Sequence, residues 1–322
     1  MQRIDSLELP SELPADKVIK SCGQNIHDYE PEFWEFRYEI DRYLKNMSND
    51  NLIKRYEDIC LNFQVLTGKE RNVIPINSFL SSWYWCRKEH QTRYEFFLRK
   101  LPLPVSPPQP RLHIEKPYRA KGPNSCDILF RYGYLEPTMK SLYEKGKTEI
   151  KPASGYKDSI AIDPRTDDEK NKHQWLIGDH TIIKTLDGKR IPIIGDVKRT
   201  VSTSDYYTLC LSCDFEPLIF QKFGYDSCVV IKNPTEFAQR LEQSSKDILP
   251  NWYFHHNPME YFDPNEPVEN QYFNATMCKD FSYAYQMEYR FIWDPLGNGK
   301  VAGNIELDLG PLTDICELYI LK

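Results

Sequence analysis

The chain has 322 residues, of which 40% are hydrophobic and 27% charged. This length fits about two ordinary domains, and this composition excludes a wholly disordered protein. The net charge of −6 arises after residue 117, because residues 1–117 hold 17 basic and 17 acidic residues and the remainder 24 and 30. Such a balance argues against broad, nonspecific binding to nucleic acid.

Neither a membrane span nor an export signal is expected. No stretch approaches the ~20 consecutive apolar residues that a transmembrane helix needs. The first residues, MQRIDSLELPSELP, contain acids and prolines where a signal peptide has a basic end and an apolar run. The nine cysteines are scattered and odd in number, which predicts reduced thiols. We therefore expect a cytoplasmic protein that does not bind membranes.

Residues 1–101 are predicted to form a small helical bundle. Apolar residues recur at helical spacing in 28–47, in 50–66 and from about 77 to 100, and Gly68 supplies a stop signal after the second segment. The aromatic residues follow the same period, which indicates a packed core. We expect this bundle to dock a protein partner or a second copy of the chain.

A proline-rich segment separates the bundle from the rest of the chain. Residues 102–110, PLPVSPPQP, hold five prolines in nine positions and cannot continue a helix. We predict a linker over 102–117 and a mixed α/β domain over 118–322, which makes the chain α+β with two separable parts.

Short strands and turns are predicted beyond the linker. A helix with Pro137 near its start and Gly146 past its end follows the first strand. Asp187-Gly188 is a hairpin signal, and Asn233 or Thr235 is expected to cap a helix. The predicted strands are 127–132, 148–154, 206–212 and 227–231, a helical turn covers 215–223, and a last hairpin pairs 288–294 with 300–307.

Gln286-Met287-Glu288 is the sharpest candidate motif. At the start of a strand, alternation directs residues two apart to one face. A carboxylate held there can stabilise the positive charge that develops when a glycosidic bond breaks, such as the nicotinamide–ribose bond of NAD. Gln286 would then orient an acceptor. The alternative interpretation is a surface glutamate paired with Arg290.

Three further residues are candidates for binding NAD. Arg131 on the first strand of the domain has the fork of donors that suits a pyrophosphate, and Tyr132 beside it can stack on a ring. Ser212 ends the strand YYTLCLS, where it can hold the nicotinamide ribose or brace the glutamate. A structural ion pair of Arg131 is the alternative.

The order of these residues along the chain resembles the Arg–Ser–Glu layout of ADP-ribosyltransferases, whose catalytic turn has the form Glu/Gln-x-Glu. The C-terminal part also resembles a large bacterial domain family found among phage-defence and abortive-infection proteins. The matching stretches are LFRY at 129–132, IKPASGYKDS at 150–159, CLSCDFEPLIFQKFG at 210–224 and YQMEYRFI at 285–292. Gln286 replaces the family's usual first glutamate, and 156–158 replaces its Asn-Asp-Pro loop.

This resemblance implies an ADP-ribosyltransferase-like split sheet and NAD as the substrate. It implies that Glu288 and Gln286 are catalytic, and that the residues binding NAD are Arg131, Tyr132, Ser154, Tyr156 and Ser212. The activity implied is transfer of ADP-ribose to a macromolecule, protein or nucleic acid, by a toxin or effector of antiphage defence.

Two other functions remain open from the residues alone. Asp196-Val197-Lys198 follows an apolar strand and has the spacing of a magnesium-dependent nuclease motif, with Asp179 or Asp187 as the second acid. The other possible function of the C-terminal domain is that of a sensor, which binds a ligand or partner without catalysis. No dinucleotide-binding GxGxxG and no P-loop is present.

Overall fold

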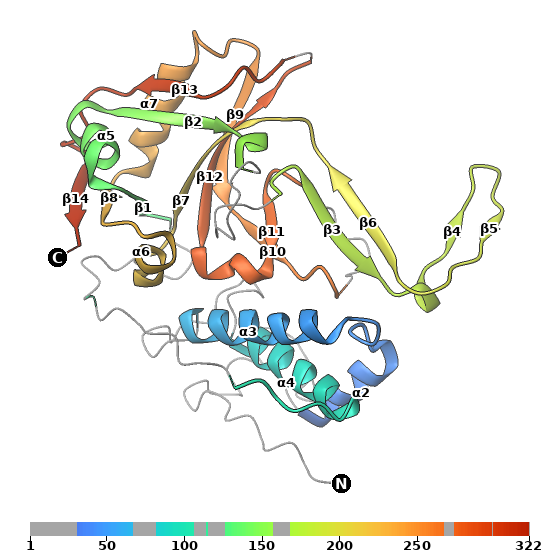
Figure 1. The fold of residues 1–322 in the computed structure, drawn as a ribbon. Helices are drawn as coiled ribbons and strands as arrows, with labels where there is room; N and C mark the ends of the chain where they lie inside the picture. Colours follow the sequence, from blue (N-terminus) through green and yellow to red (C-terminus); the bar gives the residue numbers. More distant parts are fainter. Residues whose placement is uncertain are drawn as a thin grey trace, which may run out of the picture.

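The computed structural model describes residues 31–66, 82–105, 114, 126–156, 168–266, 274–297 and 299–321. Its architecture is α+β, as predicted: helices come first in the chain and a large antiparallel sheet follows (Figure 1). Within these ranges no helix combines the length and the apolar character required to cross a membrane. Most of the predicted linker lies outside the described residues.

The N-terminal helices are α2 (Pro31–Asp41), α3 (Asn49–Leu66) and α4 (Ser82–Leu98). They match the three predicted segments, although the predicted start of the third helix lies outside the described residues. Edge-to-face contacts join Tyr38 to Tyr43 and to Tyr94, so the aromatic residues form the core of the bundle as expected. The buried members of this core are Tyr38, Tyr43, Leu44, Leu52, Tyr94 and Phe96.

The helices also pack against the sheet domain, below it in Figure 1. Arg55 of α3 and Lys88 of α4 both pair with the buried Asp263, at 2.6 and 2.5 Å. Trp85 packs against Phe281 with ring centroids 5.8 Å apart. The main hydrophobic cluster contains residues of α3, α4 and the sheet. The helices that precede the Pro-rich segment in the sequence and the sheet that follows it therefore share one hydrophobic core.

The large sheet is antiparallel throughout. Its order is β13-β2-β7-β1-β8-β14, and β12 joins β7 to β9. The strands are β1 (Leu129–Gly133), β2 (Lys147–Pro152), β7 (Tyr207–Ser212), β8 (Ser227–Ile231), β9 (Trp252–Pro258), β12 (Glu288–Pro295), β13 (Ile305–Asp308) and β14 (Cys316–Ile320).

The sheet splits along one edge of β7. Strand β12 pairs with all six residues of β7, so it occupies one edge. On the other edge β2 pairs with Tyr207 and Thr208, whereas β1 pairs with Ser212. Strands β1 and β2 therefore diverge, and the backbone of β7 between residues 208 and 212 faces an opening between them.

Helices cover both sides of this sheet. Helix α7 (Pro234–Ser245) packs Phe237 against Phe291 of β12. Helix α6 (Pro217–Phe223) packs Phe220 against Tyr132 of β1. A short 3₁₀ helix, η6 (Phe281–Gln286), leads into β12 and rests on α3. Smaller elements are the π-helix η3 (Leu135–Met139), α5 (Lys140–Lys145), the 3₁₀ helices η4 (Ala153–Tyr156) and η5 (Gly178–His180), β10 (Glu260–Phe262) and β11 (Cys278–Asp280).

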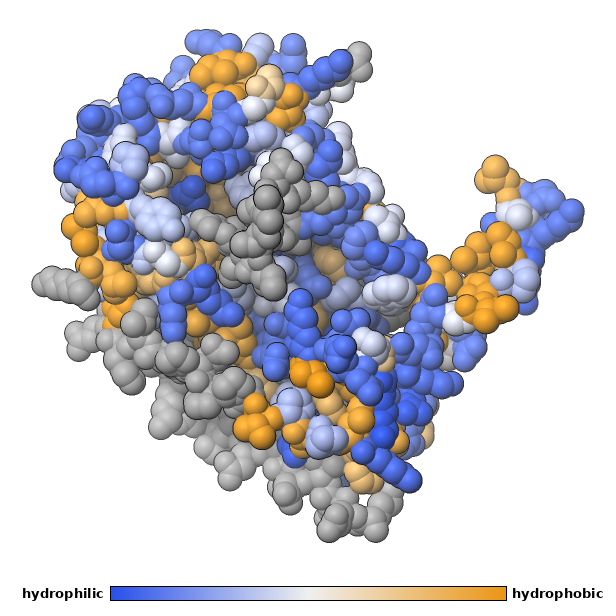
Figure 2. All heavy atoms as spheres, viewed as in Figure 1, coloured by the Kyte–Doolittle hydropathy of each residue, from blue (hydrophilic) through white to orange (hydrophobic). Residues whose placement is uncertain are grey.

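A two-stranded ribbon of β3 (Asn171–Leu176) and β6 (Val197–Ser202) leaves the body of the protein. It continues into a protruding arm, β4 (Ile183–Lys184) and β5 (Arg190–Ile191), whose turn contains the predicted Asp187-Gly188. Figure 2 shows orange, apolar side chains on this arm, and Leu186 and Ile194 are fully exposed.

Most predicted elements of the C-terminal domain are present. Gly146 ends α5 in the left-handed conformation, and Asn233 accepts a hydrogen bond from the Glu236 N–H as the cap of α7. The predicted last hairpin is wrong. Strand β12 pairs with β7 and β9, whereas β13 crosses to β2. The glycines at 297 and 299 signal a chain reversal, but a turn signal does not specify which strands pair.

Candidate functional site

A cavity of about 210 Å³ lies where β1 and β2 diverge from β7. Its walls combine charged groups with aromatic and aliphatic ones, the usual mixture in a small-molecule site. The lining residues are Phe130, Arg131, Tyr132, Glu149, Lys151, Tyr156, Glu169, Cys210, Leu211, Ser212, Ile219, Phe223, Tyr225, Lys279, Gln286 and Glu288.

Six of the seven residues predicted from the sequence line this cavity. They come from five separate elements and are Arg131, Tyr132, Tyr156, Ser212, Gln286 and Glu288. Ser154 is not among the lining residues. Its backbone N–H donates to the Asp205 carboxylate at 3.0 Å, so Ser154 anchors the turn that carries Tyr156.

The Gln286-Met287-Glu288 turn is shaped by a left-handed residue. Gln286 ends η6, Met287 has φ 42° and ψ 50°, and Glu288 begins β12. A non-glycine residue in this region is uncommon and needs support from its surroundings. Ser212 Oγ donates to the Gln286 carbonyl at 2.7 Å, and the Cys213 N–H donates to the Met287 carbonyl at 2.8 Å. Ser212 therefore supports the backbone of the turn that precedes Glu288.

The side chains of Gln286 and Glu288 converge on one lysine. Lys279 Nζ lies 3.2 Å from Gln286 Oε1 and 2.9 Å from Glu288 Oε2. Strand alternation alone predicted a common face for the two side chains. Only Glu288 belongs to the strand, so the shared direction depends on the Met287 turn.

Glu288 is buried, at 4% exposure, and ionised. Its second oxygen accepts a hydrogen bond from Arg290 Nε at 2.5 Å. Burial acts to raise the pKa of Glu288, but the charges of Arg290 and Lys279 outweigh burial and hold the pKa well below its ordinary value. The pairing with Arg290 that the sequence offered as an alternative is present, in a buried rather than a surface setting.

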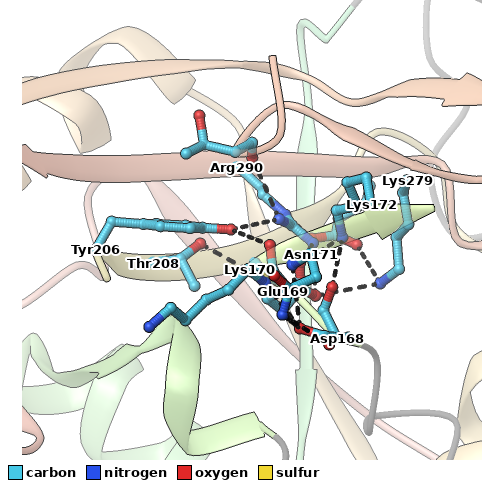
Figure 3. A network of polar contacts seen from close by, with 12 residues as sticks. Asp168, Glu169, Lys170, Asn171, Lys172, Tyr206, Thr208, Lys279 and Arg290 are labelled. Carbon is cyan, nitrogen blue, oxygen red and sulfur yellow. Dashed lines mark hydrogen bonds and ion pairs between the residues drawn. The ribbon is translucent and has the colours of Figure 1, made fainter. Parts of the chain in front are cut away.

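A second buried carboxylate, Glu169, completes the charge network (Figure 3). Arg290 Nη2 lies 2.7 Å from the Glu169 carboxylate, and the Lys172 and Lys279 ammonium groups lie 3.5 and 3.7 Å from it. Against the effect of burial, these cations lower the pKa of Glu169. Tyr206 accepts a hydrogen bond from Arg290 Nη1 at 3.2 Å.

Sequence reasoning missed Glu169 and Lys279. Glu169 belongs to the charged run DDEKNK at 167–172, which has the composition of a solvated loop. Lys279 lies next to Asp280 in the three-residue strand β11, so it too has the local composition of a solvated segment. Neither residue carried a local signal of its site, because burial of a charge depends on distant partners.

Arg131 makes a structural contact with the backbone of β7. Its Nη1 donates to the Cys210 carbonyl at 2.7 Å, at the part of β7 left open by the split. Its Nε is buried and has no hydrogen-bond partner within the described ranges. The structural ion pair that the sequence offered as an alternative is not found among the described residues, where Arg131 bonds to the backbone instead and lines the cavity.

The aromatic wall is not the one expected. The Tyr132 ring packs edge-on against Phe220, and its hydroxyl accepts the Glu216 N–H at 2.7 Å. Its faces are therefore occupied by the core. Phe223 and Tyr225, which also line the cavity, stack on each other with centroids 5.5 Å apart and offer the aromatic surface instead.

The candidate nuclease motif has a different environment. Asp196 accepts a long hydrogen bond from the Gly178 N–H and shares a surface cavity with Asp179, whereas Lys198 lies over the Trp175 ring at 5.9 Å. Asp187 is at the turn of the protruding arm, bonded to its neighbour Thr185. Over the described part of the chain, no group of three or more His, Cys, Asp or Glu residues is arranged to hold a metal ion.

Comparison of the chain with known protein families, with curated proteins and with solved structures found no match.

Proposed function

We propose that this protein is an ADP-ribosyltransferase-like enzyme that uses NAD as substrate, breaks its nicotinamide–ribose bond and transfers ADP-ribose to a macromolecule in antiphage defence. One observation carries the proposal: six residues chosen for this chemistry from distant parts of the sequence line a single cavity. The divergence of β1 and β2 from β7 also agrees with the split sheet that the motif order implies.

Glu288 supplies the negative charge that the reaction needs. When nicotinamide leaves as a neutral molecule, positive charge develops on the ribose, and a fixed carboxylate lowers the barrier if it is better placed for that charge than for neutral ribose. Lys279 and Arg290 fix the Glu288 side chain from two sides and keep it ionised. The acceptor then bonds to the ribose carbon and releases its proton to the medium.

The remaining lining residues suit the other parts of NAD. The Arg131 donors that do not contact Cys210 match a pyrophosphate oxygen, and the Phe223–Tyr225 pair suits an aromatic ring. The Gln286 amide lies beside Glu288 on Lys279, where it can orient an acceptor. The macromolecular acceptor, either protein or nucleic acid, would approach through the opening between β1 and β2.

A second candidate function is a nucleotide sensor without turnover. It is favoured by the same contacts, because both Glu288 oxygens are engaged by cations that offset part of the carboxylate charge. A cavity with buried, neutralised charge can bind a nucleotide and alter a partner interface without breaking a bond.

Incubation of the full-length protein with NAD tests these functions. Release of nicotinamide or ADP-ribosylation, followed by mass spectrometry, supports the enzyme. Binding of NAD by calorimetry without release of nicotinamide supports the sensor. Absence of both, with magnesium-dependent cutting of nucleic acid, would move the active site to Asp196 and Lys198.

A further inference from the structure

Two cysteines from distant parts of the chain meet beside the candidate site. The Sγ atoms of Cys126 and Cys213 lie 2.8 Å apart, although the residues are 87 positions apart in the sequence. Cys213 is 8% exposed, and Cys126 is partly exposed just before β1. Tertiary structure therefore holds two thiols within bonding reach with a small movement of the side chains.

Cys126 is accessible from a second cavity, on the other side of β12 from Glu288. This cavity has a volume of about 560 Å³ and is lined by Cys126, Glu242, His256 and Tyr289 among others. Tyr289 and Glu288 are consecutive in β12, so their side chains point to opposite faces of the sheet. A small oxidant can thus reach Cys126 without entering the Glu288 cavity.

We propose that Cys126 and Cys213 are a redox modification site, at which a peroxide converts the two thiols into a reversible disulfide. The Cys126 thiolate attacks one peroxide oxygen, forms a sulfenic acid and releases hydroxide, which takes up a proton to become water. The Cys213 sulfur then attacks the Cys126 sulfur, a disulfide forms, and the sulfenic oxygen leaves as a second water. In total, two thiols and one peroxide give one disulfide and two waters.

The order of these steps follows from the environment of each thiol. Cys126 lines the cavity and is the accessible member of the pair. The hydrogen bond between the two sulfurs lowers the pKa of Cys126 and raises that of Cys213. The thiolate, which is the reactive form, is therefore favoured at the exposed position.

The disulfide would lie one residue from the brace of the Glu288 turn. Cys213 follows Ser212, and its N–H is bonded to the Met287 carbonyl. The cross-link would join the end of β7 to the chain just before β1, the strand that carries Arg131. This inference is independent of the proposed reaction, because disulfide formation is measured without NAD.

Peptide mapping after treatment of the reduced, full-length protein with hydrogen peroxide tests the proposal. Free thiols are then blocked with N-ethylmaleimide before digestion. Trypsin leaves Cys210 and Cys213 on one peptide, so chymotrypsin, which cleaves after Leu211, is used to separate them. We expect a cross-linked pair that contains Cys126 and Cys213 and that disappears after reduction.

Three variants sharpen the result. Cys126→Ser and Cys213→Ser should each abolish the cross-link, whereas Cys210→Ser, three residues from Cys213, should retain it.

Oxidation should also raise the melting temperature of the wild-type protein and leave that of Cys126→Ser unchanged, since a disulfide closing a long loop restricts the unfolded chain. Maleimide on both Cys126 and Cys213 after excess peroxide, or a cross-link from Cys126 to Cys210, would overturn the proposal. The wild-type map decides the matter even if a variant fails to fold.

Discussion

Two short motifs of this chain share one local pattern and have opposite environments. Glu288-Tyr289-Arg290 and Asp196-Val197-Lys198 each place an acid and a base two residues apart at the start of a strand. Glu288 and Arg290 are 4% and 0% exposed, whereas Asp196 is partly exposed and Lys198 exposed. The same spacing therefore gives a buried charge network in one place and a solvated strand end in the other.

The strands next to each motif account for the difference. β12 pairs with β7 on one side and with β9 on the other, and its Glu288 face meets Lys279 and Glu169. Among the described strands β6 pairs only with β3, in a ribbon that leaves the body of the protein (Figure 1). Motif spacing identifies candidates, but flanking elements decide whether a carboxylate is desolvated, ionised and oriented.

Acid is expected to produce the largest effect, because it titrates the whole network around Glu288. The folded-state pKa values of Glu288 and Glu169 lie below their ordinary value, so the stability they supply is complete above a pH of about 4.3. This stability is lost as the pH falls from there through the lower, folded-state pKa values. Each carboxyl group then costs about 1.4 kcal/mol in the free energy of unfolding for each pH unit.

Urea unfolding followed by circular dichroism between pH 7 and pH 2 measures this loss. The midpoint should fall steeply below pH 4.3, and the fall should be shallower in a variant that lacks Arg290. A midpoint that stays constant to pH 2 would show that the network contributes little stability.

Arg290→Met should cost about 3–5 kcal/mol in the free energy of unfolding, because Glu169 and Glu288 would remain buried with one cation fewer. Urea denaturation at pH 7 gives the value. Lys198→Met is the matched control on the exposed motif and should change stability by less than about 0.5 kcal/mol. Equal effects of the two substitutions would remove the distinction between the motifs.

Glu288→Gln keeps the shape of the side chain and removes its charge. If Glu288 stabilises the charge on ribose, NAD turnover should fall by at least ~100-fold while NAD affinity changes little. Nicotinamide release and calorimetry provide the two measurements, after thermal melting has verified that the variant is folded. Full turnover in Glu288→Gln would exclude this carboxylate as the catalytic group.

Arg131→Ala should mainly weaken NAD binding, by roughly 1.5–3 kcal/mol, if the guanidinium makes a charge-assisted bond to the pyrophosphate. Calorimetric titration measures the change. Arg199→Ala, at an exposed position of β6, is the control and should bind NAD like the wild type. Unchanged affinity in Arg131→Ala would limit this residue to its bond with the Cys210 carbonyl.

Asp196→Asn should have the smallest effect. Asp196 accepts a long hydrogen bond from the Gly178 N–H, so stability should change by less than about 0.5 kcal/mol and NAD turnover should be retained. If the substitution instead abolishes a magnesium-dependent cleavage of nucleic acid, the nuclease interpretation gains support.

Local signals in the sequence determined most of the elements. Gly146 and Asn233 mark helix ends because one tolerates the left-handed conformation and the other satisfies a free N–H, and both properties belong to single residues. The strand YYTLCLS and the residues chosen around NAD chemistry were likewise visible as short patterns. Residue types and their order along the chain therefore predicted four strands that line the cavity, β1, β2, β7 and β12, and six of its polar and aromatic side chains.

Tertiary structure alone decided what those residues contact. The pairing of β13 with β2, the burial of Glu169 and Lys279, and the packing of α3 and α4 on the sheet all join segments far apart in the sequence. Local propensity carries no information about such partners. A charge is buried stably only when distant groups neutralise it. The left-handed Met287 is supported by Ser212, which bonds to the Gln286 carbonyl, and by the Cys213 N–H, which bonds to the Met287 carbonyl. Such features become visible only once the chain has folded.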